Sequence, residues 1–119
     1  MNKILIVEDE KSLSEAIKFK MEHQGVNAFV SNSAEEAMNI LQKEDIDLIW
    51  LDLKLPKISG IEFLKIVRDN PAWKDKKVII VSASGSDDMK QKAKEMGILD
   101  YIVKNEMKLD DIIKRAANA

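Results

Sequence analysis

The sequence contains no cysteine, few aromatic residues (5%) and almost no net charge (−2 at pH 7). Without cysteine the chain forms no disulfide, thiolate metal site or cysteine nucleophile. The near-balanced charge argues against nucleic-acid binding as its main task, because contact with a phosphate backbone needs a strong basic excess. No apolar run approaches the ~20 residues of a membrane span, and the N-terminus turns acidic at Glu8, unlike a signal peptide. We therefore expect a soluble, cytoplasmic protein without nucleic-acid or membrane partners.

The length and composition fit one folded domain over residues 1–119. Apolar residues make up 45% of the chain, which is enough for a core, and charged residues make up 34%, which gives a well-solvated surface. A chain of this length leaves no room for a second domain. We find no internal repeat, linker or low-complexity stretch.

Five short apolar runs alternate with five stretches of helical periodicity. The first, third and fourth runs are almost continuously apolar and rich in β-branched residues, as is typical of parallel strands covered on both faces. The predicted strands are Lys3–Val7, Val26–Val30, Leu48–Leu51, Val78–Val81 and Tyr101–Val103.

Local signals place the helices between these strands. Ser33 and Glu36 have the spacing of a capping box, and a third helix is expected to begin near Gly60 and end before Pro71. Residues at helical spacing predict the inner faces: Leu13, Ala16, Ile17 and Met21 in the first helix, which stops at Gly25; Ala37, Met38 and Leu41 in the second; Met89, Ala93 and Met96 in the fourth, which stops at Gly97; and Leu109, Ile112, Ile113, Ala116 and Ala117 in the fifth.

This alternation predicts an α/β fold, a doubly wound five-stranded parallel sheet flanked by five helices, as in flavodoxin-like proteins. In such sheets the functional site lies outside the carboxyl ends of the strands. Glu8 and Asp9 follow the first strand and Asp52 follows the third, so we expect their carboxylates to converge. Ser31 and Asn32, after the second strand, look like ordinary loop residues.

A cluster of carboxylates needs a cation, because two of them ~4 Å apart repel by about 4 kcal/mol at an effective dielectric near 20. Mg²⁺ suits a site with few carboxylates, several waters and a phosphate. Lys104 follows the fifth strand and Ser82 follows the fourth, adding an ammonium and a hydroxyl. With Asp52 as nucleophile, these groups can hold a transferring phosphoryl group. Each residue alone fits a turn, a cap or a solvated surface; their coincidence at four strand ends favours the chemical interpretation.

The sequence resembles the receiver domain of two-component response regulators, the CheY-like family, over essentially its whole length. The most specific stretch is 52–60, DLKLPKISG, which matches the family's phosphoacceptor loop with Pro four and Gly eight residues beyond the Asp. The stretches Glu8-Asp9, Val81-Ser82-Ala83 and 100–104 (DYIVK) add to the match.

The resemblance implies that Asp52 accepts a phosphoryl group from a histidine kinase or a histidine phosphotransfer protein. It implies that Mg²⁺ is bound by the carboxylates of Asp9 and Asp52 and the backbone carbonyl of Lys54, with Glu8 acting through metal-bound water. The domain would then be a switch rather than an enzyme, catalysing only its own phosphorylation and dephosphorylation.

The resemblance also implies how phosphorylation is sensed. Ser82 and Tyr101 would be the switch residues and Lys104 would pair with the phosphoryl oxygens. The fourth helix, fifth strand and fifth helix would form the face that binds a downstream protein, as a monomer or a phosphorylation-dependent dimer. Three departures from the family pattern remove no required group: Asn105 follows Lys104 where Pro is frequent, Lys54 places a cation near the site, and Ser82 replaces the commoner Thr.

Other functions on this fold are less well supported. A phosphorylation-independent interaction module remains the alternative, although the complete set of reactive groups counts against it. A flavin-binding protein needs a Ser/Thr/Gly-rich phosphate loop where this chain has Glu8-Asp9-Glu10. A haloacid-type phosphatase needs a second Asp that the sequence Asp52-Leu53-Lys54 lacks.

Overall fold

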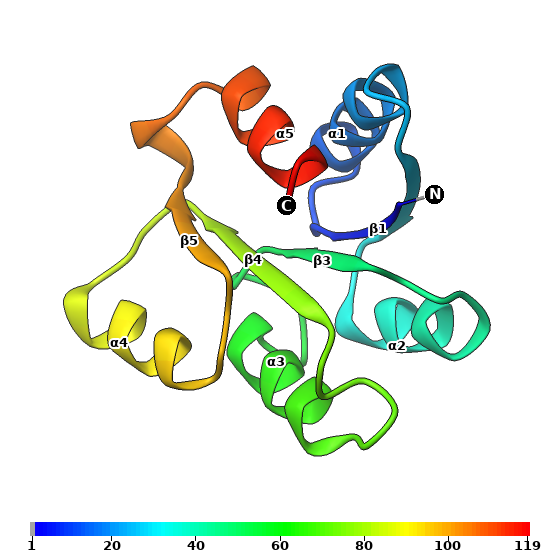
Figure 1. Cartoon of the computed structure of the whole chain (residues 1–119). Coiled ribbons are helices and arrows are strands. Elements are labelled where there is room, and N and C mark those ends of the chain that lie inside the picture. The colour runs from blue at the N-terminus through cyan, green and yellow to red at the C-terminus, as the bar shows by residue number, and fades with distance from the viewer. Residues whose placement is uncertain (1) are drawn as a thin grey trace.

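The computed structural model describes residues 2–119, in which strands and helices alternate as the sequence predicts (Figure 1). A 3₁₀ turn, Lys104–Glu106, follows the last strand. The elements are β1 Lys3–Val7, α1 Lys11–His23, β2 Asn27–Ser31, α2 Ala34–Lys43, β3 Leu48–Leu51, α3 Gly60–Asp69, β4 Lys77–Ser82, α4 Asp87–Glu95, β5 Asp100–Val103 and α5 Leu109–Ala117. Of the helices in this part of the chain, none is both long and apolar enough to cross a bilayer.

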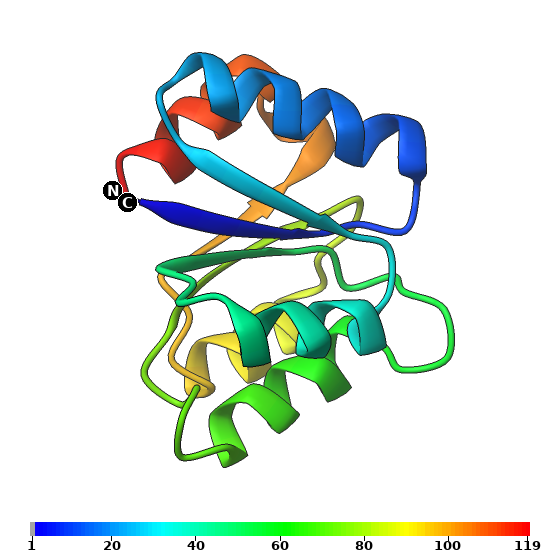
Figure 2. The same ribbon diagram turned by 90° about the vertical axis from the view of Figure 1, so that its right-hand side faces the viewer.

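All five strands lie parallel in one sheet, in the order β2-β1-β3-β4-β5. Helices α1 and α5 cover one face and α2, α3 and α4 cover the other, which makes three layers (Figure 2). The doubly wound fold is therefore confirmed. The strand order reverses between β1 and β3, and this is the position where ligands of such sheets bind, beyond the carboxyl ends of the strands.

The core explains why the central strands are apolar throughout. All four residues of β3 are buried, and they alternate between the two faces of the sheet. Ile49 and Leu51 pack with α2, α3 and α4, whereas Leu48 and Trp50 pack with α1 and α5. A strand covered on both sides has no polar face, and it therefore carries its charged groups only at its ends.

Several expected boundaries need correction. Strand β2 begins and ends one residue later than predicted. Its pairing with β1 starts at Asn27, opposite Lys3, and finishes at Ser31, opposite Val7. Strand β4 is one residue longer at each end, and β5 begins one residue earlier. Gly25 and Gly97 do end α1 and α4, with φ angles of 78° and 74° that favour glycine.

Two details of the helices were predicted wrongly. Ala16 is exposed on α1, and the buried face uses Ser14 with Ile17 and Met21. The capping box at Ser33 is only half formed: the Ser33 hydroxyl accepts from the Glu36 N–H (3.2 Å), but the Glu36 carboxylate accepts from the N–H of Asn32 (2.9 Å). The complete reciprocal box lies at the start of α3 instead, where Ser59 and Glu62 cap each other.

Candidate functional site

Three acidic residues meet at the carboxyl edge of the sheet, beside the reversal of strand order. Glu8 and Asp9 directly follow β1, and Asp52 directly follows β3. One carboxylate oxygen from each lies within 4.8 Å of the others. Glu8 and Asp52 are only 1% and 5% exposed, whereas Asp9 is open to solvent. The site therefore has a buried acidic floor and one acid at its mouth.

Lys104 lies between the two buried acids. Its Nζ donates to Glu8 Oε1 at 2.6 Å and to Asp52 Oδ2 at 2.9 Å. Burial lowers the pKa of Lys104, but the hydrogen bonds and charges of Glu8 and Asp52 outweigh it, so the pKa lies above its ordinary value. The ammonium thus supplies one permanent positive charge among three carboxylates.

The backbone fixes the direction in which Asp52 points. Its N–H donates to the carbonyl of Val7 at 3.0 Å, which extends the pairing of β3 with β1 by one residue. Its Oδ1 accepts from the N–H of Lys54 at 3.1 Å, while Oδ2 faces Lys104. The Lys54 side chain itself is exposed. Each carboxylate oxygen of Asp52 therefore accepts a hydrogen bond from a different donor, which fixes the orientation of the group.

Ser82 and Tyr101 lie on the β4–β5 side of the same edge. Ser82 ends β4 and is 5% exposed, and its hydroxyl accepts from the N–H of Ser84 at 3.5 Å. The Tyr101 hydroxyl donates to the carbonyl of Ser84 at 2.8 Å, so the ring lies toward the loop between β4 and α4. Burial raises the pKa of Tyr101, and the negative charge of Asp52 adds to the effect.

The sequence-based interpretation of Ser31 and Asn32 as ordinary loop residues was wrong. The Asn32 amide donates to the carbonyl of Glu8 at 2.7 Å and to the hydroxyl of Ser14 at 3.1 Å. The buried Ser31 hydroxyl donates to the carbonyl of Ile6 at 3.0 Å. These residues hold the end of β1 and thereby position Glu8. Their position at the end of β2, which lies next to β1 in the sheet, is the signal by which the sequence could have identified these two residues.

Glu8 is the acid most affected by burial. Desolvation, together with the neighbouring Asp52 charge, raises its pKa from 4.5 to about 7, and the hydrogen bonds from Lys104 and from the Glu10 N–H oppose this rise. At pH values between 4.5 and about 7, the Glu8 carboxyl group is therefore protonated in the folded chain and ionised in the unfolded chain.

We therefore expect the metal-free protein to lose stability as the pH rises from about 4.5 to about 7. The loss from Glu8 is on the order of 3 kcal/mol, at about 1.4 kcal/mol per pKa unit. Urea unfolding in EDTA, repeated across this pH range, measures it. Glu8→Gln should flatten that part of the profile, and an unchanged slope in Glu8→Gln would contradict the assignment.

The donor set suits a hard divalent cation. Carboxylate oxygens from Glu8, Asp9 and Asp52 are close enough to share one ion, and Asp9 faces the solvent from which an ion and its waters arrive. Without cysteine in the chain, and with oxygen donors at this edge, the site suits hard cations better than softer metals.

Comparison with known proteins agrees with the geometry. The family model described as "Response regulator receiver domain" matches residues 4–117. The transcriptional regulatory protein CpxR of Escherichia coli (strain K12) is 36% identical over 104 residues, which cover 87% of this chain and 43% of CpxR. The chain thus spans less than half the length of the curated relatives it matches.

Solved structures give the same result. The receiver domain of Francisella response regulator 1452 is 31% identical, with a TM-score of 0.87 over 99% of this chain and 94% of that one. The chemotaxis protein CheY4 of Vibrio cholerae is 26% identical, with a TM-score of 0.87 over 97% of this chain and 95% of that one.

Proposed function

This chain belongs to the response regulator receiver domain family of two-component systems, and we propose that residues 1–119 form a phosphorylation switch whose acceptor is Asp52. The observation that carries the proposal is the setting of Asp52: a nearly buried carboxylate, bonded to Lys104 at 2.9 Å and clustered with Glu8 and Asp9. Receiver domains are switch domains rather than classical enzymes. The chain would catalyse only its own phosphorylation and dephosphorylation.

The proposed reaction is phosphoryl transfer from a phosphohistidine to Asp52. A carboxylate oxygen of Asp52 attacks phosphorus, and the P–N bond breaks. The imidazole of the donor keeps the bonding electron pair and takes up a proton, which leaves an acyl phosphate on Asp52. Positioning and charge neutralisation carry most of such a transfer, and Lys104 supplies a fixed positive charge beside the reacting carboxylate.

The resident cofactor of this proposal is Mg²⁺. Asp9, Asp52 and the carbonyl of Lys54 would hold it, and Glu8 would act through its waters. When bound, the ion neutralises the charge that gathers on the phosphoryl oxygens. The exposure of Asp9 supports this assignment, because a half-open site leaves room for waters and for the phosphoryl group.

Once formed, the acyl phosphate carries about −1.5 to −2 charges and three acceptor oxygens. We propose that Lys104 pairs with one of these oxygens and that the Ser82 hydroxyl turns toward another. Tyr101 already reaches the carbonyl of Ser84, so a movement at Ser82 is passed to the loop that leads into α4. The face formed by α4, β5 and α5 would then bind the downstream protein.

The partners follow from this role. A histidine kinase or a histidine phosphotransfer protein would donate the phosphoryl group, which requires a cytoplasmic location. A downstream protein would read the switch, either through the monomer or through a phosphorylation-dependent dimer. CpxR is named a transcriptional regulator, and a transcriptional output through a longer or associated protein is therefore the first one to test.

Incubation with a small-molecule phosphodonor and Mg²⁺ tests the proposal. We expect intact-protein mass spectrometry to show a single added phosphoryl group that alkali removes, as an acyl phosphate requires, and EDTA to prevent its formation. A chain that gains no mass under these conditions would leave the phosphorylation-independent interaction module as the better function.

A further inference from the structure

Helix α4 is held more weakly by apolar packing than α5, the other helix of the face formed by α4, β5 and α5. Of the nine residues Asp87–Glu95, all of them described by the structure, Ala93 alone is buried. Most of its other side chains are charged and face solvent. Short helices gain most of their stability from a packed apolar face, so the position of α4 depends on the contacts made at its two ends.

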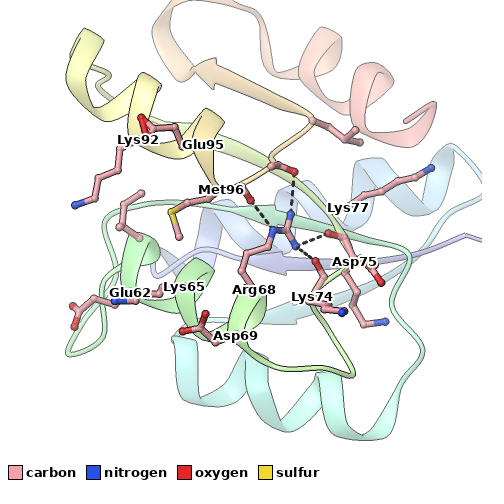
Figure 3. A pocket seen from close by; sticks show the side chains of 14 residues that line it. Glu62, Lys65, Arg68, Asp69, Lys74, Asp75, Lys77, Lys92, Glu95 and Met96 are labelled. Atoms are coloured by element: carbon pink, nitrogen blue, oxygen red, sulfur yellow. Dashed lines mark hydrogen bonds between the residues drawn. The ribbon is translucent and has the colours of Figure 1, made fainter.

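The side chain of Arg68, in α3, is hydrogen-bonded to the C-terminal end of α4. Its Nε donates to the carbonyl of Met96 at 2.7 Å, and its Nη2 donates to the carbonyl of Gly97 at 3.2 Å (Figure 3). These carbonyls lie at the helix C-terminus, where the partial charge is negative, so a guanidinium is favoured there. Immediately beyond, the N–H of Leu99 donates to the carbonyl of Val78 in β4 at 2.8 Å.

Arg68 is itself fixed by the loop between α3 and β4. Its Nη1 donates to the carbonyls of Lys74 and Lys76 at 3.0 and 2.9 Å (Figure 3). Burial lowers the pKa of Arg68 and the nearby charge of Asp75 opposes this, and an arginine keeps its charge in proteins. A rigid, charged fork bound to four backbone carbonyls from two segments makes a stiff connection.

Among residues 2–119, no side chain makes such a connection to the N-terminal end of α4. The Ser86 hydroxyl caps the helix by accepting from the N–H of Met89 at 3.2 Å, which is a local contact. For residues 84–89, the one hydrogen bond to a distant segment within the described chain is that of Tyr101 to the carbonyl of Ser84. A Cβ at Gly85 would lie 2.8 Å from the Tyr101 ring, so the contact exists because residue 85 has no side chain.

We propose that Arg68 is a positioning residue that fixes the C-terminal end of α4, so that displacement of the helix is confined to its N-terminal end. The helix then turns about Arg68 when Tyr101 moves, instead of shifting as a whole. This deepens the proposed function and rests on it only where phosphorylation is the cause of the movement; the fixed end is a property of the resting protein.

Distances between paired spin labels test the proposal directly, and the chain has no native cysteine to interfere. Exposed positions give two pairs: Lys43→Cys in α2 with Glu95→Cys at the fixed end, and Lys43→Cys with Asp88→Cys at the free end. In the resting protein, Arg68→Gln should broaden the distance distribution of the Glu95 pair about twofold, as a locally released helix end samples several positions. Arg115→Gln is the matched control, because the ion pair that Arg115 makes with Asp100 is exposed and does not involve α4.

The second arm adds Mg²⁺ and a phosphoryl analogue, beryllium fluoride. In the wild type, we expect the label-to-label distance of the Asp88 pair to change and that of the Glu95 pair to stay the same. In Arg68→Gln, we expect both distances to change. Arg68→Lys keeps the charge but loses the planar guanidinium with its several donors, so it should broaden the distance distribution of the Glu95 pair to an intermediate extent. This variant also provides the test if Arg68→Gln does not fold.

The outcomes separate the two hypotheses. If the Glu95 pair stays as narrow in the Arg68 variants as in the wild type, the anchoring role is wrong, whether or not the chain is phosphorylated. If the phosphoryl analogue and the phosphodonor both leave the wild type unchanged, the proposed function fails, and the resting-state widths still decide the role of Arg68.

Discussion

Asp52→Asn should leave the fold intact and abolish covalent phosphorylation of the chain. The amide has nearly the shape of the carboxylate, and its oxygen can still accept from the N–H of Lys54 or from Lys104, as the Asp52 oxygens do now. It cannot act as the nucleophile, because the nitrogen lone pair is delocalised and the group is neutral. We expect no phosphoryl adduct by intact mass after treatment with phosphodonor and Mg²⁺.

Asp47→Asn is the matched control for this experiment. Asp47 precedes the same strand that Asp52 follows, and its carboxylate accepts from the N–H of Lys3 at the opposite edge of the sheet. This variant should be phosphorylated like the wild type. An adduct that persists in Asp52→Asn would show that another group, with Asp9 the first candidate, accepts the phosphoryl group. If Asp52→Asn leaves partner binding unchanged, the phosphorylation-independent interaction module is favoured instead.

The strands could be predicted because their sequence has one dominant cause. A parallel strand covered on both faces must be apolar along its whole length, so β1 and β3 were delimited without error as Lys3–Val7 and Leu48–Leu51. At β2, the buried Val26 continues the apolar run, but the ladder begins only at Asn27. Burial and hydrogen-bonded pairing are different properties, and only the first is visible in hydrophobicity.

The placement of the acids followed from the topology, since strands that are parallel must end at the same edge. The supporting contacts did not. Asn32 bonds Glu8 and Ser14 across three segments, and such contacts depend on the distances between loops rather than on any local pattern. Likewise, the Glu36 carboxylate accepts from the N–H of Asn32, at the end of β2, and does not complete the capping box with Ser33. Spacing identifies a possible cap, but the tertiary structure selects its donor.

Gly60 shows the same limit more sharply, and it leads to the second large effect. The family resemblance identifies a glycine eight residues beyond the acceptor without a physical reason. In the structure, a Cβ at Gly60 would lie 2.4 Å from the Cα of Leu53 and 2.5 Å from the carbonyl oxygen of Asp52. The N–H of Gly60 also donates to the carbonyl of Leu53 at 2.9 Å. The start of α3 therefore packs directly against the backbone of Asp52, the proposed acceptor.

Gly60→Ala should consequently damage both stability and phosphorylation. The atoms in the way are backbone atoms, which cannot rotate aside, so either α3 or the acceptor must move. Overpacking of this kind costs about 1–3 kcal/mol, measured as a lower urea midpoint. A shift of about 1 Å in a reacting group can slow a reaction about 100-fold, and we expect a loss of that order in the rate of adduct formation.

Gly25→Ala separates this steric effect from the ordinary cost of replacing a glycine. No atom beyond the two adjacent residues lies within 4 Å of a Cβ at Gly25, but its φ of 78° makes any other residue unfavourable there, by about 1–2 kcal/mol. Gly25→Ala should therefore lose stability and keep the wild-type phosphorylation rate, whereas Gly60→Ala should lose both. If the two variants are phosphorylated equally fast, contact between Gly60 and the acceptor backbone does not position Asp52, and the bonds from Lys54 and Lys104 must hold the carboxylate by themselves.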